Sequence, residues 1–261
     1  RRPFARIKSM AADISADEAR AKGYVTGAEK KEEVFALLRR VTLPTTIYKK
    51  QKLDRDDVID IADFDTVSWM KTEMRFMLQE ELARAILVGD GRAVEDADKI
   101  AEANIRPIYN DAVFYTHRIQ LANGTNVSDQ IDAVTGSRQY YKGSGAPKLY
   151  CTSAWLTSML LLKDGDGRRM YPTQESLAAA LRVSGIVEVP VMDSQVTDGH
   201  ELLGIVVNMT DYVIGADKGG QTTFFEDFNI DFNQMQYLYE TRCSGALVRP
   251  KSAVVIEIAQ A

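Results

Sequence analysis

The chain has 261 residues, of which 45% are hydrophobic and 26% are charged, and its formal net charge is −5. This length allows a substantial core, built as one large domain or as two lobes that share elements. No run approaches the roughly 20 apolar residues that cross a bilayer, and the acidic balance argues against a protein that coats nucleic acid through a broad basic face.

The first sixty residues predict helices followed by strands. Residues 15–18 and 26–29 are capping-box sequences, in which a hydroxyl residue precedes a carboxylate by three positions. Each predicts a helix start, and the second helix is expected to end before Pro44. Residues 45–48 and 58–61 have the composition of strands, with a charged link between them. We expect this region to project from the body of the protein.

Residues 65–91 predict one long amphipathic helix. Asp65 is predicted to be the N-cap, and Gly89 is predicted to be the glycine that ends the helix. A helix of about 24 residues is a rod of roughly 36 Å. Its apolar residues recur every three or four positions, so that one face is buried and the other is solvated or shared with a neighbour. The residues of the apolar face are Val67, Met70, Met74, Leu78, Leu82 and Ile86.

The rest of the chain mixes helices and strands. A short helical patch is predicted over residues 96–103. The sequence Gly-Ser-Gly-Ala-Pro at 143–147 is the best candidate for a boundary between lobes. Because βαβ alternation is absent, the pattern indicates an α+β fold. Beyond the boundary, strand 148–151 and helices 154–163 and 174–182 precede strands at 187–191, 203–208, 212–215, 222–225, 235–242 and 253–258.

Residue types that carry catalysis are present, but not in catalytic patterns. His117 and His200 are the only histidines, and neither has a second ligand at metal-binding spacing. Cys151 and Cys243 lie far apart and lack a nucleophile signature, which favours small buried side chains in a reducing compartment. No serine lies in a Gly-x-Ser-x-Gly elbow. The sequence therefore predicts no catalytic site.

One acidic turn partly matches a calcium-binding loop. Asp164, Asp166 and Glu175 occupy positions one, three and twelve of that pattern. Arg168 and Arg169 stand where the pattern needs an oxygen ligand and a glycine. Two cations there would repel the metal, so a tight turn is predicted instead, and no metal or cofactor is expected.

Three segments resemble the major capsid proteins of tailed bacteriophages, which share the Hong Kong 97 capsid fold. Residues 80–91 resemble the end of that family's spine helix. Residues 148–172 resemble the start of its axial domain, where a strand and a helix end in a Lys-Asp-x-x-Gly-Arg turn. Residues 227–250 resemble the strand that returns to the peripheral domain. The order of the segments is also that of the family.

The resemblance implies an α+β Hong Kong 97-like capsid fold with a long spine helix, a peripheral domain, an axial domain and an extended loop that lies over a neighbouring subunit. The implied division is an N-terminal arm and extended-loop region at 1–61, a peripheral domain with the spine helix at 62–145, an axial domain at 146–223, and return strands of the peripheral domain at 224–261.

The implied function is that of a major capsid protein, a structural subunit without enzymatic activity. It would self-assemble into hexamers and pentamers of an icosahedral shell around double-stranded DNA, in a virion assembled in the host bacterial cytoplasm. Its partners would be its own copies, DNA bound without sequence specificity, and scaffold, portal and decoration proteins. No cofactor and no membrane are implied.

Charged residues supply candidate subunit contacts, since arginine suits partly buried ion pairs. Pairing within the subunit is the alternative. Some members of the family join subunits by a lysine–asparagine isopeptide bond with the help of a glutamate, for which Asn229 or Asn233, Glu240 and one of the lysines are candidates. The contact candidates are Lys49, Lys50, Lys52, Arg84, Arg168, Arg242 and Arg249.

Two other functions stay open at the level of sequence. A cellular nanocompartment shell of the same fold would enclose cargo protein instead of a genome. A soluble α+β hydrolase with an unrecognised site would be a compact monomer or dimer, whereas a shell subunit forms particles of megadalton mass or hexameric capsomers.

Overall fold

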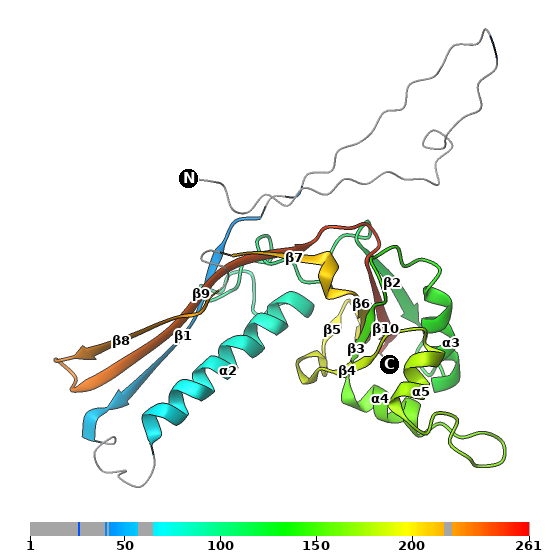
Figure 1. The fold of residues 1–261 in the computed structure, drawn as a ribbon, viewed down its shortest axis with the longest axis horizontal. Coiled ribbons are helices and arrows are strands. Elements are labelled where there is room, and N and C mark those ends of the chain that lie inside the picture. Colours follow the sequence, from blue (N-terminus) through cyan, green and yellow to red (C-terminus); the bar gives the residue numbers. More distant parts are fainter. Residues whose placement is uncertain (1–25, 27–39, 41, 57–64, 217–220, 261) are drawn as a thin grey trace.

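The computed structural model describes residues 26, 40, 42–56, 65–216 and 221–260. The described part of the chain is elongated, with a thin wing at one end and a thicker lobe at the other (Figure 1). We call one sheet together with helix α2 (Thr66–Leu87) the wing, and the remaining helices and strands the lobe. The strands of the wing sheet are β1 (Thr45–Asp54), β7 (Tyr212–Ala216), β8 (Thr223–Asn229) and β9 (Gln234–Leu247). The helices predicted before residue 40 and the strand predicted at 58–61 lie outside the described residues.

The wing sheet is antiparallel and is built around one long strand, β9 (Gln234–Leu247). Strand β1 (Thr45–Asp54) pairs along one edge of β9, from Thr45 opposite Cys243 to Asp54 opposite Gln234. Strands β8 (Thr223–Asn229) and β7 (Tyr212–Ala216) pair in turn along the other edge.

Strand β1 continues through the lysine-rich stretch that was predicted to be a charged link. It does so because β9 supplies backbone partners along its whole length. As an edge strand, β1 can hold lysines, whose side chains reach solvent. The predicted link was therefore wrong in its bounds.

Helix α2 (Thr66–Leu87) confirms the predicted long helix. The Asp65 carboxylate accepts a hydrogen bond from the backbone N–H of Ser68 at 3.0 Å, which is an N-cap. After Val88, Gly89 takes φ +93°, a left-handed conformation that glycine adopts without strain. The inner face, including Met70, packs on the wing sheet.

The segment after α2 forms turns instead of the predicted helix at 96–103. The buried carboxylate of Asp90 accepts a hydrogen bond from the Ile100 N–H at 2.6 Å and forms an ion pair with Lys99 at 3.2 Å. These bonds, with burial working against them, lower the pKa of Asp90. Because the Ile100 N–H donates to Asp90, it is not available for the Asp96 carbonyl, with which it would pair in a helix over 96–103.

The lobe contains a mixed sheet with the order β2-β10-β6-β3-β4, in which β5 pairs with β6. Helices α3, α4 and α5 contribute to the core on one face, and α2 and β9 reach the core on the other. Residues 253–256 of β10 are fully buried, as expected for a strand covered on both faces. The bounds are β2 (Thr116–Leu121), α3 (Val127–Ser137), β3 (Lys148–Cys151), α4 (Ser153–Leu160), α5 (Gln174–Ala180), β4 (Ile186–Glu188), η2 (Pro190–Met192), β5 (Val196–Thr197), β6 (His200–Val207), η3 (Met209–Asp211) and β10 (Ala253–Ala259).

Candidate assembly surfaces

The wing exposes large apolar side chains on the outward face of α2. Trp69, Phe76 and Met77 are 54%, 62% and 45% exposed, although the opposite side of the same helix is buried. Trp69 and Phe76 are seven residues apart and therefore lie along one line of the helix. Exposed apolar area of this kind marks an interaction surface.

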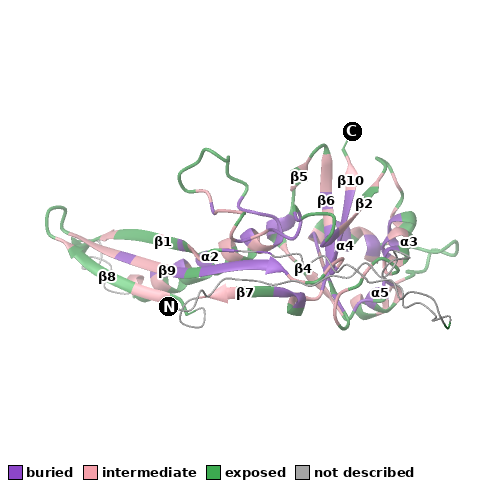
Figure 2. Ribbon diagram, turned by 90° about the horizontal axis from the view of Figure 1, so that it is seen from above, coloured by how far each residue is buried: buried purple, intermediate pink, exposed green. Residues whose placement is uncertain are grey.

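The far face of the wing sheet, opposite α2, is also partly apolar. Tyr48 is opposite Glu240, while Lys50 and Phe225 flank Leu238 on either side. Seen from above, β1 and β8 are largely exposed, whereas the lobe strands β6 and β10 are buried over much of their length (Figure 2). The wing consists of one sheet packed against one helix. The outward face of α2 and the sheet face opposite α2 therefore have no further layer of the described subunit to cover them.

The turn between β8 and β9 carries further exposed apolar residues. Ile230 and Phe232 are 83% and 66% exposed. The turn is held in shape by Asn229, whose side-chain oxygen accepts a hydrogen bond from the Asp231 N–H at 3.1 Å, and by Asn233 at φ +52°. These residues lie at the end of the wing farthest from the lobe (Figure 1).

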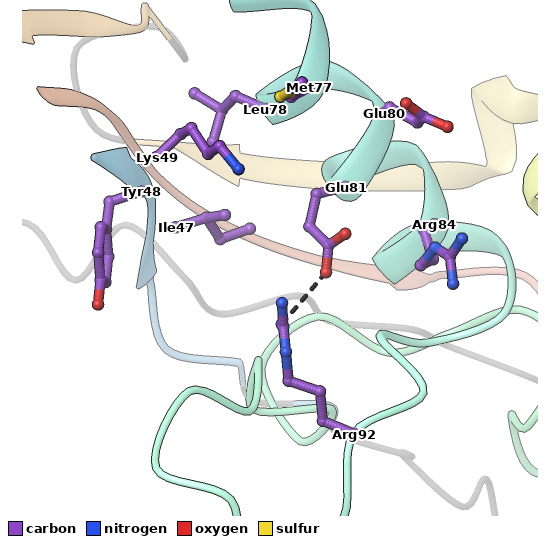
Figure 3. Close-up of a pocket in the computed structure, with 9 residues that line it drawn as sticks. All are labelled: Ile47, Tyr48, Lys49, Met77, Leu78, Glu80, Glu81, Arg84 and Arg92. Atoms are coloured by element: carbon purple, nitrogen blue, oxygen red, sulfur yellow. Dashed lines mark hydrogen bonds and ion pairs between the residues drawn. The ribbon is translucent and has the colours of Figure 1, made fainter. Parts of the chain in front are cut away.

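A pocket of about 300 Å³ opens between β1 and α2. Within it, Arg92 forms an ion pair with Glu81 at 3.2 Å (Figure 3). Lys49 and Arg84 line the same pocket, and neither side chain has an ion-pair partner among the described residues. Glu80 also lines the pocket without an ion-pair partner among the described residues, so the lining carries three cations and two carboxylates. This excess of one positive charge favours an acidic side chain. Its lining residues are Ile47, Tyr48, Lys49, Met77, Leu78, Glu80, Glu81, Arg84 and Arg92.

The other contact candidates are spread over the molecule. Lys50 and Lys52 are exposed on the far face of β1, and Arg242 is exposed on β9 opposite Thr46. Arg168 is exposed in a turn of the lobe, where its backbone N–H donates to Asp164 Oδ1 at 2.8 Å. The structure thus brings Lys49 and Arg84 into one pocket and leaves these four apart from it.

Arg249 pairs within the subunit, as the alternative at the level of sequence allowed. Its Nε lies 3.4 Å from Asp211 Oδ1, and its side chain is 57% exposed. The sequence did not single out Asp211, whose carboxylate is buried at the junction of wing and lobe.

The candidates for a covalent cross-link are not adjacent in the subunit. Asn229 is opposite Gln234, and Glu240 lies six residues farther along β9. At the usual rise of a strand this separation is about 20 Å. Asn233 Nδ2 lies 3.5 Å from Asp56 Oδ1 at the turn. The structure therefore does not bring either asparagine to Glu240.

The outward aromatic residues of α2 and the buried ion pair of Arg40 with Asp111 were not predicted from the sequence. The seven-residue spacing of Trp69 and Phe76 is a signal that the sequence contained. Arg40 and Asp111 are 71 residues apart, and no local pattern joins them.

Burial shifts the pKa values of both cysteines and of one histidine in the described residues. Burial raises the pKa of the Cys151 thiol to about 12 and also raises the pKa of Cys243. Burial and the nearby Lys251 lower the pKa of His117. In the described ranges, no cluster of three histidine, cysteine or carboxylate side chains is placed to hold a metal ion.

The described helices include none with the length and apolar character required to cross a membrane.

Comparison with known proteins gives a family and a fold. The phage capsid family matches residues 5–258, and no curated protein sequence matches the chain. A solved structure from Mycobacterium phage Ogopogo has a TM-score of 0.69 at 13% identity and covers 99% of this chain and 89% of its own.

Two further solved structures have a similar fold. One from Gordonia phage Cozz has a TM-score of 0.66 at 13% identity, covering 98% of this chain and 81% of its own. The capsid of a native GTA particle has a TM-score of 0.64 at 13% identity, covering 92% of this chain and 81% of its own. The predicted α+β Hong Kong 97-like fold is confirmed. The chain belongs to the phage capsid family, and it is a major capsid protein, a structural and non-enzymatic subunit of an icosahedral virion shell.

Proposed function

We propose that this capsid protein assembles first into hexamers and pentamers, and that its wing is the part which neighbouring copies cover. The exposed apolar residues on both faces of the wing carry this proposal. Trp69 and Phe76 on α2, and Tyr48 and Phe225 on the far face of the sheet, are each at least 49% exposed. Contact with other copies would bury both faces without adding a layer to the subunit itself.

The pocket between β1 and α2 supplies the charged part of the proposed contact. Lys49 and Arg84 would receive carboxylates of a neighbouring copy, because the nearby Glu81 is already paired with Arg92. Partly enclosed ion pairs specify the register of a contact more than they add to its affinity. Lys50, Lys52, Arg168 and Arg242 are proposed as further contacts at the subunit surface.

The proposed division into domains follows the ranges 1–61, 62–145, 146–223 and 224–261. Support comes from the wing, where α2 of the second range packs against β9 of the fourth. In three dimensions the lobe also takes β2 and α3 from the second range and β10 from the fourth. Most of the lobe therefore comes from the proposed axial domain at 146–223, whose strand β7 lies in the wing.

The proposed content of the shell is double-stranded DNA bound without sequence specificity. A net charge of −5 supports this, since a wall without strong positive charge would not hold packed DNA tightly. Scaffold, portal and decoration proteins are also proposed as partners, and this proposal is supported only by membership of the phage capsid family.

Negative-stain imaging and light scattering of the purified protein test the proposal. Shells of megadalton mass, or rings of six and five copies, are expected. A compact monomer or dimer at every concentration would contradict it. Nuclease-protected DNA inside the shells distinguishes a virus capsid from a nanocompartment, which would contain a second protein. Boiling the particles in detergent tests a cross-link from Lys49, Lys50 or Lys52 to Asn229 or Asn233, with Glu240 as the assisting carboxylate, because only a covalent bond leaves a ladder above the monomer.

A further inference from the structure

The chain passes between lobe and wing at a junction where three segments lie together. Strand β6 of the lobe leads through η3 to β7 of the wing, and β9 of the wing leads to β10 of the lobe. The backbone N–H of Val248, in the second of these connections, donates to the carbonyl of Asp211, in the first, at 3.0 Å. The loop before β3 is the third segment, and its Lys142 N–H donates to the Lys251 carbonyl at 2.8 Å.

The side chain of Asp211 joins these segments. Its carboxylate accepts hydrogen bonds from the Ser144 N–H at 2.7 Å and from the Ser144 hydroxyl at 2.6 Å. Arg249 Nε lies 3.4 Å away. The carboxylate is 2% exposed, so these charge-assisted bonds act where water does not compete. One residue of η3 is therefore tied both to the loop before β3 and to the connection from β9 to β10.

Neighbouring groups complete the arrangement. Asn208 donates through its side-chain nitrogen to the Ser144 carbonyl at 2.7 Å, and the hydroxyls of Ser144 and Thr210 are 3.0 Å apart. A Cβ at Gly143 would overlap the phenol of Tyr141 and would lie 2.7 Å from Asp211 Oδ2, so the approach of this loop to both side chains requires glycine. Burial and the negative charge of Asp211 raise the pKa of Tyr141 to about 12, which keeps that phenol neutral.

We infer that Asp211 is a positioning residue that fixes the angle between wing and lobe, and through that angle the curvature of the shell. The inference rests on the proposed function, in which copies meet through the wing. The angle between wing and lobe within one subunit sets the angle between neighbouring subunits. If the first angle varies from copy to copy, shells of different radii form. Ser144, in the loop before β3, and Arg249, in the connection from β9 to β10, both hold Asp211. Loss of either should widen the range of angles without removing a contact surface.

The test uses the full chain and two variants, Ser144→Ala and Arg249→Met. Particle diameters are measured by electron microscopy, and amide exchange at position 144 is measured by mass spectrometry on the unassembled subunit. Both variants are expected to fold and to form particles with a broader distribution of diameters than the wild type. Exchange at position 144 should be about tenfold faster, as the loss of one such hydrogen bond allows. Ser144→Thr keeps the hydroxyl and should keep a single diameter.

Matched controls remove similar bonds away from the junction. Ser153→Ala removes the hydrogen bond from Ser153 Oγ to Glu188 at 2.8 Å within the lobe, and Lys71→Met removes the ion pair of Lys71 with Glu226 at 3.2 Å within the wing. Neither control should broaden the diameters. If Ser144→Ala does not fold, Arg249→Met carries the same test through an exposed side chain.

The possible failures are distinguishable. A single wild-type diameter in both variants would overturn the role of Asp211 while leaving assembly itself intact. A wild type that forms no particles would instead contradict the proposed function, and exchange at position 144 would still decide whether Asp211 restrains the junction. Unchanged exchange in both variants would overturn the inference.

Discussion

Arg40 and Asp111 form a buried ion pair beside the end of β9. Their side chains are 7% and 2% exposed. Arg40 also donates to the Leu247 carbonyl at 2.9 Å, at the end of β9, and its guanidinium lies 3.5 Å from the centre of the Tyr115 ring. Arginine suits this site because its planar group both stacks and pairs.

Replacement of Arg40 by methionine should destabilise the subunit, because it leaves the Asp111 carboxylate buried without a counter-ion. Breaking such a pair costs about 3–5 kcal/mol, which lowers the melting temperature by roughly 10 °C in a protein of this size. The measurement is thermal unfolding of the unassembled subunit.

The double variant R40M/D111N is the control for that substitution, because it removes both charges. It should be more stable than R40M alone. An unchanged melting temperature in R40M would show that the pair does not contribute to the fold.

The outward aromatic residues of α2 should matter for assembly and little for folding. Replacement of Trp69 and Phe76 by serine should destabilise the subunit less than replacement of a buried residue of α2, since more than half of each side chain is already exposed. The yield of particles should fall sharply, because the contact loses its apolar area. The assay compares the melting temperature of the subunit with the particle fraction in sedimentation.

Met74→Ser is the matched control for this pair. Met74 lies on the same helix but is 2% exposed and packs on Tyr237. Its replacement should lower the melting temperature by creating a cavity and burying a hydroxyl. Normal assembly of W69S/F76S would show that neighbours do not cover this face of α2.

The charged pocket should make assembly sensitive to charge reversal. Lys49→Glu combined with Arg84→Glu places two more carboxylates beside Glu80 and Glu81. A neighbouring acidic side chain would then be repelled, so assembly at low salt is expected to fall. High salt should recover part of the loss, because it screens the repulsion between partly exposed charges.

Lys148→Glu provides the comparison, since Lys148 is exposed at the start of β3 in the lobe. It should assemble as the wild type does. If the pocket variant and the wild type assemble equally at all salt concentrations, the pocket is not part of the contact between subunits.

The fold was predictable where a local pattern decides the structure. The helix 65–91 was predicted because apolar spacing, an N-cap at Asp65 and a glycine stop at Gly89 all act within one element, and the structure has each of them. The lysines of β1 have low strand propensity, so the length of that strand depends on β9, almost two hundred residues away. Distant pairing of this kind leaves no local signal.

The candidate surfaces were predictable only as separate residues. Lys49 and Arg84 were each identified from the sequence, but their shared pocket exists because β1 packs beside α2. The ties of Asp211 to Ser144 and Arg249 likewise come from the meeting of three segments. A carboxylate in a short turn has no sequence signature that marks it as buried.

The buried thiol of Cys151 should make the subunit less stable in alkali. Its pKa is raised from 9.0 to about 12 by burial first and then by Glu188 and Asp193. In the unfolded chain the thiol loses its proton near pH 9, whereas in the folded protein it stays protonated up to about pH 12. The unfolded state therefore binds fewer protons than the folded state between pH 9 and pH 12. Stability is therefore full below about pH 9 and falls by up to about 1.4 kcal/mol per pH unit from there toward pH 12.

Denaturant unfolding of the subunit at several pH values between 8 and 11 measures this slope. Cys151→Ala lowers stability at every pH because it leaves a cavity, but its slope should be shallower than that of the wild type, since the group that titrates is absent. Burial also raises the pKa of Tyr141 and Tyr212, so part of the slope persists in the variant. Parallel slopes in the two proteins would mean that Cys151 is not the group responsible.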